Sequence, residues 1–100
     1  MTINVRRLIW DSWNIDHILR HGVVPEEVIE VARGNHLVLR GKKNNRLILV
    51  GSSESGRVLE VILQNKGKRE YYPVSAYDAS NDIKKLYQRK TTGGDEHEKK

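Results

Sequence analysis

The sequence predicts an α+β domain in which N-terminal helices pack on a mostly antiparallel sheet and a C-terminal helix follows. Three observations support this prediction. Apolar residues recur at helical spacing in the first third of the chain. Four segments rich in β-forming residues fill residues 36–77, and a further segment with apolar residues at helical spacing follows them. The β-rich segments are joined by short polar turns, which favour antiparallel neighbours. A chain of 100 residues suits one domain, expected over residues 1–90.

A short strand over Val5–Trp10 is expected to lead into the first helix, Ser12–His21. Asp11 precedes that helix, and its carboxylate can accept the unpaired N–H groups of the first turn. Gly22 follows it and can adopt the left-handed conformation that ends a helix. The apolar residues within the segment fall on one helical stripe.

A second helix is expected to begin near Pro25. Proline has no backbone N–H, and the N–H groups of a first helical turn have no partner within the helix in any case. Glu26 and Glu27 then lie where the helix dipole favours negative charge. Gly34 is the expected end of this helix.

Four strands are expected at His36–Arg40, Arg46–Ser52, Arg57–Gln64 and Arg69–Tyr77. Pro73 lies within the last of them and cannot donate a ladder hydrogen bond, so it predicts an edge, a bulge or the end of the strand. Ser80 can cap a final helix over Asn81–Lys90. Residues 91–100 contain no apolar side chain and are expected to form a disordered tail.

The composition excludes several classes of protein. Because the chain has no cysteine, it can form neither a disulfide framework nor a thiolate zinc site. No apolar run approaches the roughly 18 residues of a membrane span, and the N-terminus lacks a secretory apolar block. A cytoplasmic protein without a membrane partner is therefore expected.

Positive charge is concentrated in the middle of the chain. Residues 33–90 carry thirteen Lys and Arg against five Asp and Glu, a balance of +8, whereas residues 1–32 are at −2 and residues 91–100 at −1. Such asymmetry favours an acidic partner, either a phosphate backbone or an acidic protein. A lysine-rich surface without a partner is the alternative interpretation.

Short signatures at the two ends of the domain carry a family resemblance. They are Trp10-Asp11-Ser12-Trp13-Asn14-Ile15, His21-Gly22-Val23, Pro73-Val74-Ser75-Ala76, Ala79-Ser80 and Leu86-Tyr87. In this order and spacing, from about Leu8 to Arg89, the chain resembles the BrnT-like family, the toxin halves of bacterial type II toxin–antitoxin modules. The resemblance implies a fold like that of RelE-type ribonucleases, RNA cleavage without a metal or cofactor, and a cognate antitoxin partner.

Metal-independent ribonucleases of this kind need cations that hold the scissile phosphate and a group that moves the proton of the 2′-hydroxyl. The expected catalytic residues are Arg57, Lys84, Arg89 and Tyr77. The expected RNA-binding residues are Lys68, Arg69, Tyr71 and Lys85, because tyrosines interleaved with cations can stack on bases. One contiguous face is expected to combine the cations of the last strand and the last helix.

The chain departs from the family pattern at Tyr77 and Asn81, where related toxins tend to carry a cation. Neither side chain can replace a charge-assisted, bidentate contact between arginine and phosphate. The expected function is therefore that of a toxin-like endoribonuclease with weakened cleavage. The alternatives are a non-catalytic RNA- or protein-binding module on the same fold and a structural protein.

His17 and His21 are four residues apart, a spacing that could hold a metal, but no third ligand accompanies them. A structural role is the expected one, and the same holds for His36. Trp10 is expected in the core, whereas Trp13 could lie in the core or mark a partner site.

Overall fold

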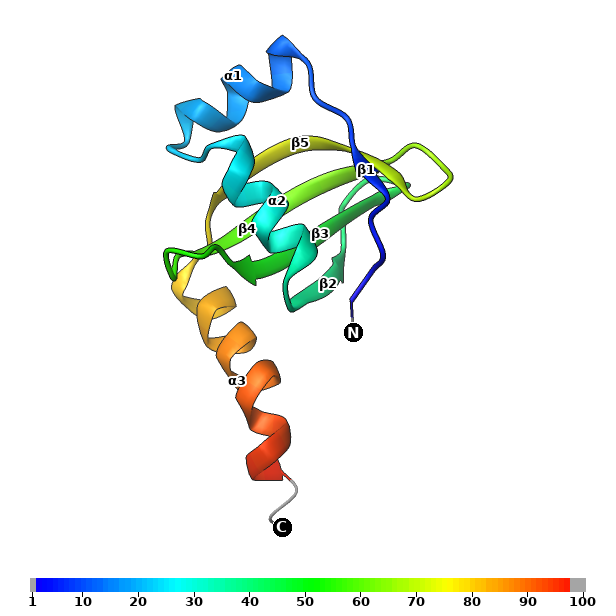
Figure 1. Ribbon diagram of the computed structural model, residues 1–100. Helices are drawn as coiled ribbons and strands as arrows, with labels where there is room; N and C mark the ends of the chain where they lie inside the picture. Colours follow the sequence, from blue (N-terminus) through cyan, green and yellow to red (C-terminus); the bar gives the residue numbers. More distant parts are fainter. Residues whose placement is uncertain (1, 98–100) are drawn as a thin grey trace.

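The structure, a computed structural model, describes residues 2–97 and the side chains of residues 2–91. Three helices accompany a five-stranded sheet with the order β1-β5-β4-β3-β2. The elements are β1 (Arg7–Leu8), α1 (Ser12–Arg20), α2 (Pro25–Arg33), β2 (His36–Arg40), β3 (Arg46–Ser52), β4 (Val58–Asn65), β5 (Glu70–Asp78) and α3 (Asn81–His97). Helices α1 and α2 lie across one face of the sheet, and α3 leaves the end of β5 (Figure 1). The predicted α+β class is confirmed.

Strands β2 to β5 form an antiparallel meander, as the short turns predicted. Strand β1 differs from the prediction, because only two residues of the expected Val5–Trp10 segment pair, and they pair parallel to β5. A parallel neighbour requires a long crossover. The chain between β1 and β5 contains two helices and three strands, so that requirement is met.

Pro73 marks a bulge in β5. Ile62 pairs with Ser75, but Leu63 pairs with Pro73, so the register shifts by one residue and Val74 is left over. A bulge at a residue that cannot donate to the ladder is one of the three outcomes that the sequence predicted.

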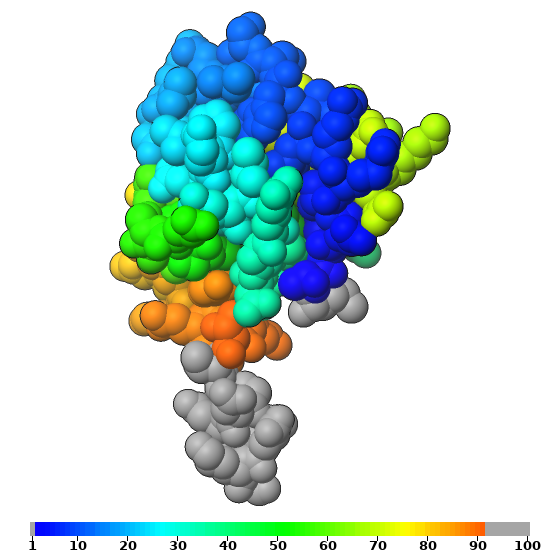
Figure 2. Space-filling view, in the orientation of Figure 1, coloured from blue at the N-terminus to red at the C-terminus, as the bar shows by residue number. Residues whose placement is uncertain are grey.

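The core lies between the sheet and the two N-terminal helices. Its fully buried members include Ile18, Val23, Val28 and Val31 from the helical layer and Leu49, Leu59, Val61 and Leu63 from the strands. Figure 2 shows how α1, α2 and the N-terminal segment cover this face. On the opposite face Val50 is also fully buried, where α3 contacts β2 and β3.

The first helix begins where the sequence predicted and ends one residue earlier than predicted, at Arg20. Asn14 N donates to Asp11 Oδ1 at 2.9 Å, and Asp11 N donates to Asn14 Oδ1 at 2.9 Å, which forms a reciprocal capping box. The fully buried Asn14 amide also donates to the Ile9 carbonyl at 3.0 Å. Gly22 follows the helix with φ of +77°, the left-handed conformation that favours glycine.

The C-terminal helix is longer than predicted. Ser80 caps it, since Ile83 N donates to Ser80 Oγ at 3.3 Å, but the helix continues to His97 where the sequence indicated an end near Lys90. Once a helix is nucleated, each further residue adds a hydrogen bond without a new nucleation cost. Of the tail expected to be disordered, residues 91–97 continue α3, and residues 98–100 lie outside the described residues. None of the described helices is long and apolar enough to cross a membrane.

The capping box should carry measurable stability. We expect Asp11→Ala to lower the free energy of unfolding by about 1 kcal/mol, because it leaves the first-turn N–H groups without an acceptor. Urea denaturation followed by circular dichroism measures this change. The matched control is Asp16→Ala, which removes an exposed carboxylate on the same helix; an equal loss there would contradict the capping role.

Candidate functional site

The sheet face opposite α1 and α2 presents three rows of side chains across β3, β4 and β5. The register aligns Val50, Glu60 and Tyr77 in one row, Ile48, Ile62 and Ser75 in the next, and Arg46, Gln64 and Tyr72 in the third. Arg46 Nε donates to Gln64 Oε1 at 2.8 Å, which fixes that guanidinium on the face. Val50 is fully buried where α3 contacts β2 and β3, and we call the part of this face that α3 does not cover the open face.

A hollow of about 230 Å³ lies on the open face. It is lined by Gly41, Lys42, Lys43, Arg46, Ile48, Ile62 and Tyr77. The apolar floor comes from the central strands, and the cations come from the turn between β2 and β3 and from the start of β3. The structure thus places the predicted catalytic Tyr77 beside three cations that the sequence analysis did not select.

Tyr77 is held as a neutral phenol. Burial of its ring and the nearby carboxylate of Glu60 raise its pKa above the ordinary value of 10.0. At neutral pH its hydroxyl can therefore donate a hydrogen bond to a phosphate oxygen but cannot take a proton as a base.

A row of rings leads from α1 to Tyr77. Trp13 stacks on His17 with ring centroids 4.9 Å apart, His17 meets His21 edge-on at 5.2 Å, and His21 meets Tyr77 edge-on at 5.9 Å. His21 is held in place because its Nδ1–H donates to the Ala76 carbonyl at 3.2 Å. Trp13 is 57% exposed, so it lies outside the core. The two histidines thus have the expected structural contacts, and His21 also contacts Tyr77 at the border of the open face.

Arg57 is committed to structural contacts. Its Nε donates to Asp78 Oδ1 at 2.8 Å, and its Nη1 donates to the Gly22 carbonyl at 2.8 Å and to Glu27 Oε1 at 3.1 Å. These bonds raise the pKa of Arg57 and lower the pKa of Asp78. A guanidinium that already serves two carboxylates has little capacity for a phosphate. The catalytic role that the sequence suggested for Arg57 therefore has no support in this geometry.

The remaining predicted cations separate into two groups at opposite ends of the sheet. Lys84, Lys85 and Arg89 lie on α3, beyond the end of β5, and Lys84 is close enough to Asp78 to help lower its pKa. Lys68 and Arg69 lie in the turn before β5. With a rise of about 3.3 Å per residue, the nine residues of β5 separate the groups by about 30 Å. The single contiguous face stays a prediction, and its cations would have to border both ends of β5.

Tyr71 corrects another expectation. It is only 7% exposed and belongs to the core cluster beneath the helices. Strand alternation points Tyr71 and Tyr72 to opposite faces, and Tyr71 falls on the buried one. Its ring cannot stack on an RNA base in this fold.

The sequence contains a signal for one of the three cations that line the hollow. Arg46 alternates with Ile48 along β3, so period-2 spacing places both on one face. Lys42 and Lys43 lie in the turn between β2 and β3, and the curvature of that turn over the open face does not follow from local spacing. Neither lysine forms an ion pair among the described residues.

The histidines and carboxylates offer no metal cage within residues 2–91, where no group of three or more such side chains converges. His36 is buried, and its Nδ1–H donates to the carbonyls of Val31 and Gly34 at 3.1 and 3.0 Å. Its Nε2 accepts from Ile3 N at 3.1 Å, which ties the N-terminal segment to α2. These contacts confirm the structural role expected for His36.

No family model and no curated protein matches the chain in sequence. Among solved structures, the chain is similar to the crystal structure of the Brucella abortus ribonuclease toxin BrnT, with a TM-score of 0.61. The chain has a BrnT-like fold. The similarity covers 75% of this chain and 97% of BrnT at 22% sequence identity, so it establishes the architecture that the family resemblance implied.

The contacts of Arg57 make a prediction for stability and pH within the BrnT-like fold. Arg57→Ala should lower the free energy of unfolding by about 1–3 kcal/mol, because it leaves the partly buried Glu27 carboxylate without its charged donor. Because Arg57 lowers the pKa of Asp78 in the folded state, Asp78 stabilises the fold above pH of about 4, and this contribution is lost as the pH falls through the lower folded pKa.

Denaturation midpoints measured between neutral and acidic pH test this linkage. Asp78→Asn should reduce stability at neutral pH and flatten the acid limb of the profile. In an Arg57→Ala background the same substitution should have almost no further effect. An undiminished effect there would show that Asp78 does not act through Arg57.

Proposed function

We propose that the chain is the toxin-like component of a toxin–antitoxin pair and that its open face binds RNA. The observation that carries the proposal is the hollow that the neutral phenol of Tyr77 lines together with Lys42, Lys43 and Arg46. The BrnT-like fold also supports the proposal of a toxin-like function, since BrnT is a ribonuclease toxin. The cognate antitoxin is the proposed protein partner, and the cytoplasm is the proposed place of action.

The binding chemistry follows from the lining of the hollow. Three cations can neutralise phosphates, and the Tyr77 hydroxyl can donate to a phosphate oxygen or its ring can contact a base. The apolar floor of Ile48 and Ile62 offers a surface for the base itself. Lys68 and Arg69 lie at the other end of β5 from Tyr77, so we assign them no more than contacts along a longer RNA strand. Lys84, on the first turn of α3 and close to Asp78, is placed to add a contact nearer to Tyr77.

The proposed cleavage is an attack of a 2′-hydroxyl oxygen on the adjacent phosphorus. The hydroxyl proton passes to a base, the bond to the 5′-oxygen breaks, and that oxygen takes up a proton. Glu60 and His21 flank Tyr77 and are the groups placed to exchange these protons. Tyr77 and Asn81 provide no charge where related toxins tend to carry a cation, so the proposed activity is weak.

The alternative is a non-catalytic binding module on the same fold. The position of Arg57 favours it over a rearranged active site, because Arg57 is bound by Asp78 and Glu27 and cannot replace the missing cations. Under this alternative the open face keeps its affinity for RNA and loses only the cleavage step.

RNA binding tests the open face directly. We expect Lys42→Ala combined with Lys43→Ala to weaken binding of single-stranded RNA and to reduce the slope of log K against log salt by about 1.4, because two phosphate contacts are lost. Fluorescence anisotropy over a salt series measures both quantities. The matched control is Arg20→Ala with Arg33→Ala, which removes the same charge from the helical layer; an equal loss in the control would disprove the assignment.

Cleavage is tested with purified protein and single-stranded RNA. We expect wild-type cleavage to be weak, and Tyr77→Arg with Asn81→Arg to raise it by on the order of 10²–10³-fold if phosphate charge is what the site lacks. Fast wild-type cleavage that survives both Lys84→Ala and Arg89→Ala would refute the proposal of a weakened or rearranged site. Folded protein, shown by circular dichroism, is required for each variant.

A further inference from the structure

A second hollow, of about 270 Å³, lies between β1 and α2 on the helical side of the sheet. Its apolar lining comes from Val5, Leu8, Trp10, Ile29 and Ala32, and its other lining residues are Arg6, Arg7 and Arg33. We call it the arginine hollow. It shares no residue with the hollow beside Tyr77.

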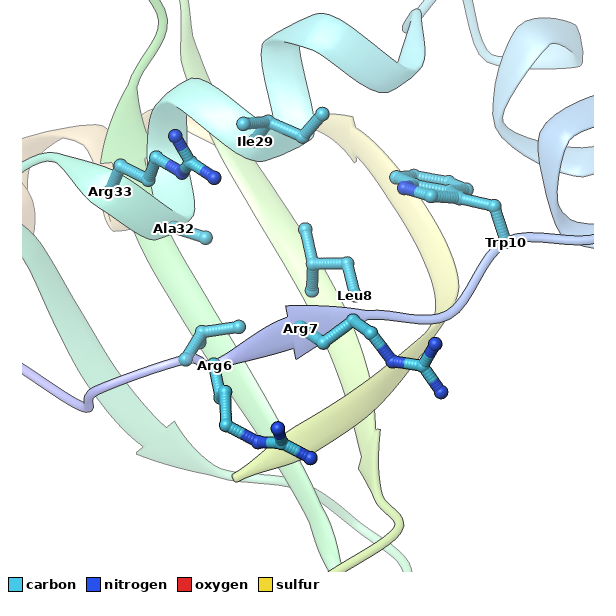
Figure 3. A pocket seen from close by; sticks show the side chains of 8 residues that line it. Arg6, Arg7, Leu8, Trp10, Ile29, Ala32 and Arg33 are labelled. Atoms are coloured by element: carbon cyan, nitrogen blue, oxygen red, sulfur yellow. The ribbon is translucent and has the colours of Figure 1, made fainter. Parts of the chain in front are cut away.

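Figure 3 shows how these side chains are arranged. Leu8 points from β1 towards Ile29, Trp10 lies at one end, and the guanidinium of Arg33 lies beside the last turn of α2. Arg6 and Arg7 extend from the other side of β1, at the rim of the hollow. Arg33 is exposed and forms no ion pair within the described part of the chain. An unpaired guanidinium above an apolar floor is suited to a ligand that combines an apolar group with an anion.

The surroundings add further positive charge. Arg6 and Arg7 both pair with Glu70, and the two arginine side chains are 52% and 64% exposed. Arg6 N also donates to the Arg69 carbonyl at 2.8 Å, and Arg6 Nε donates to the Lys68 carbonyl at 3.4 Å. The turn that contains Lys68 and Arg69 therefore lies directly beside Arg6. Two guanidinium groups sharing one carboxylate leave a positive surplus beside the arginine hollow.

We propose that the arginine hollow binds an acidic segment of the partner protein, with one large apolar side chain in the hollow and carboxylates on Arg7 and Arg33. The inference rests on the proposed function in that the partner is the proposed antitoxin. Because this hollow lies on the helical side, the partner is anchored away from the open face.

The lining distinguishes a peptide from RNA as the occupant. Apart from the arginines and the indole of Trp10, each lining side chain is aliphatic and carries no group that could read a base edge. The volume falls below the roughly 300–1,000 Å³ of sites that enclose a whole small molecule, and it suits one anchoring side chain. The guanidinium fork matches carboxylate and phosphate alike, so the apolar lining carries the distinction.

The test uses a short fluorescein-labelled peptide in which leucine and glutamate alternate. We expect saturable binding to the full chain at low salt, and a loss of on the order of tenfold or more for Arg7→Glu combined with Arg33→Glu. Arg40→Glu with Lys90→Glu is the control of equal charge change and should keep most of the affinity. A peptide with serine in place of leucine should bind more weakly, because the anchor is lost.

Single-stranded RNA is titrated against the same variants. The Arg7 and Arg33 variant should bind RNA as well as its charge-matched control does. The inference is overturned if the wild type shows no saturable peptide binding, if the control loses as much affinity as the variant, or if serine replaces leucine without effect. It is also overturned if the variant loses RNA binding and keeps peptide binding. Failure of the wild type to bind RNA, with the peptide results as expected, would contradict the RNA-binding proposal alone.

Discussion

Arg57 joins parts of the molecule that are distant in sequence. Its guanidinium contacts the left-handed turn at Gly22, the first turn of α2 at Glu27 and the end of β5 at Asp78. The two helices are thereby fixed relative to the strand that carries Tyr77. Because Arg57 holds Asp78 at the end of β5, α3 begins shortly after a strand end that is fixed in place. A residue that looks from sequence like a candidate phosphate ligand thus acts as the main polar connection between the helical layer and the sheet.

Most secondary structure was predictable because it depends on local chemistry. Asp11 and Gly22 mark the two ends of α1 through contacts and backbone conformation within the same few residues. Pro25 starts α2 because of its own backbone chemistry. The parallel pairing of β1 with β5 was not predictable, since it depends on contacts between residues more than sixty positions apart. The extent of α3 was also missed, because its last turns contain no apolar spacing that could indicate a helix.

The candidate site was predictable only in part. Tyr77 lines the hollow on the open face, while its predicted catalytic role stays a prediction, and charge counted along the chain could not show which cations share that hollow. Antiparallel strands carry consecutive segments to alternate ends of the sheet, so Arg69 and Lys84 separate although both flank β5. In the same way Arg6 belongs to an acidic stretch of sequence and yet lies beside Arg69 in space. The net charge of a surface depends on which residues the strand register brings together, so a count of charges along the chain does not predict it.

The outer edge of β5 has a consequence for the behaviour of the protein in solution. Strand β1 covers only Glu70 and Tyr71, and an uncovered edge is a template on which a strand from another molecule can add. Three features obstruct this addition along the rest of β5: Pro73 has no N–H to offer, the bulge at Val74 disturbs the spacing, and His21 occupies the Ala76 carbonyl. His21, one of the rings between α1 and Tyr77, thereby also helps to protect the sheet from edge-to-edge aggregation at the edge where β1 is very short.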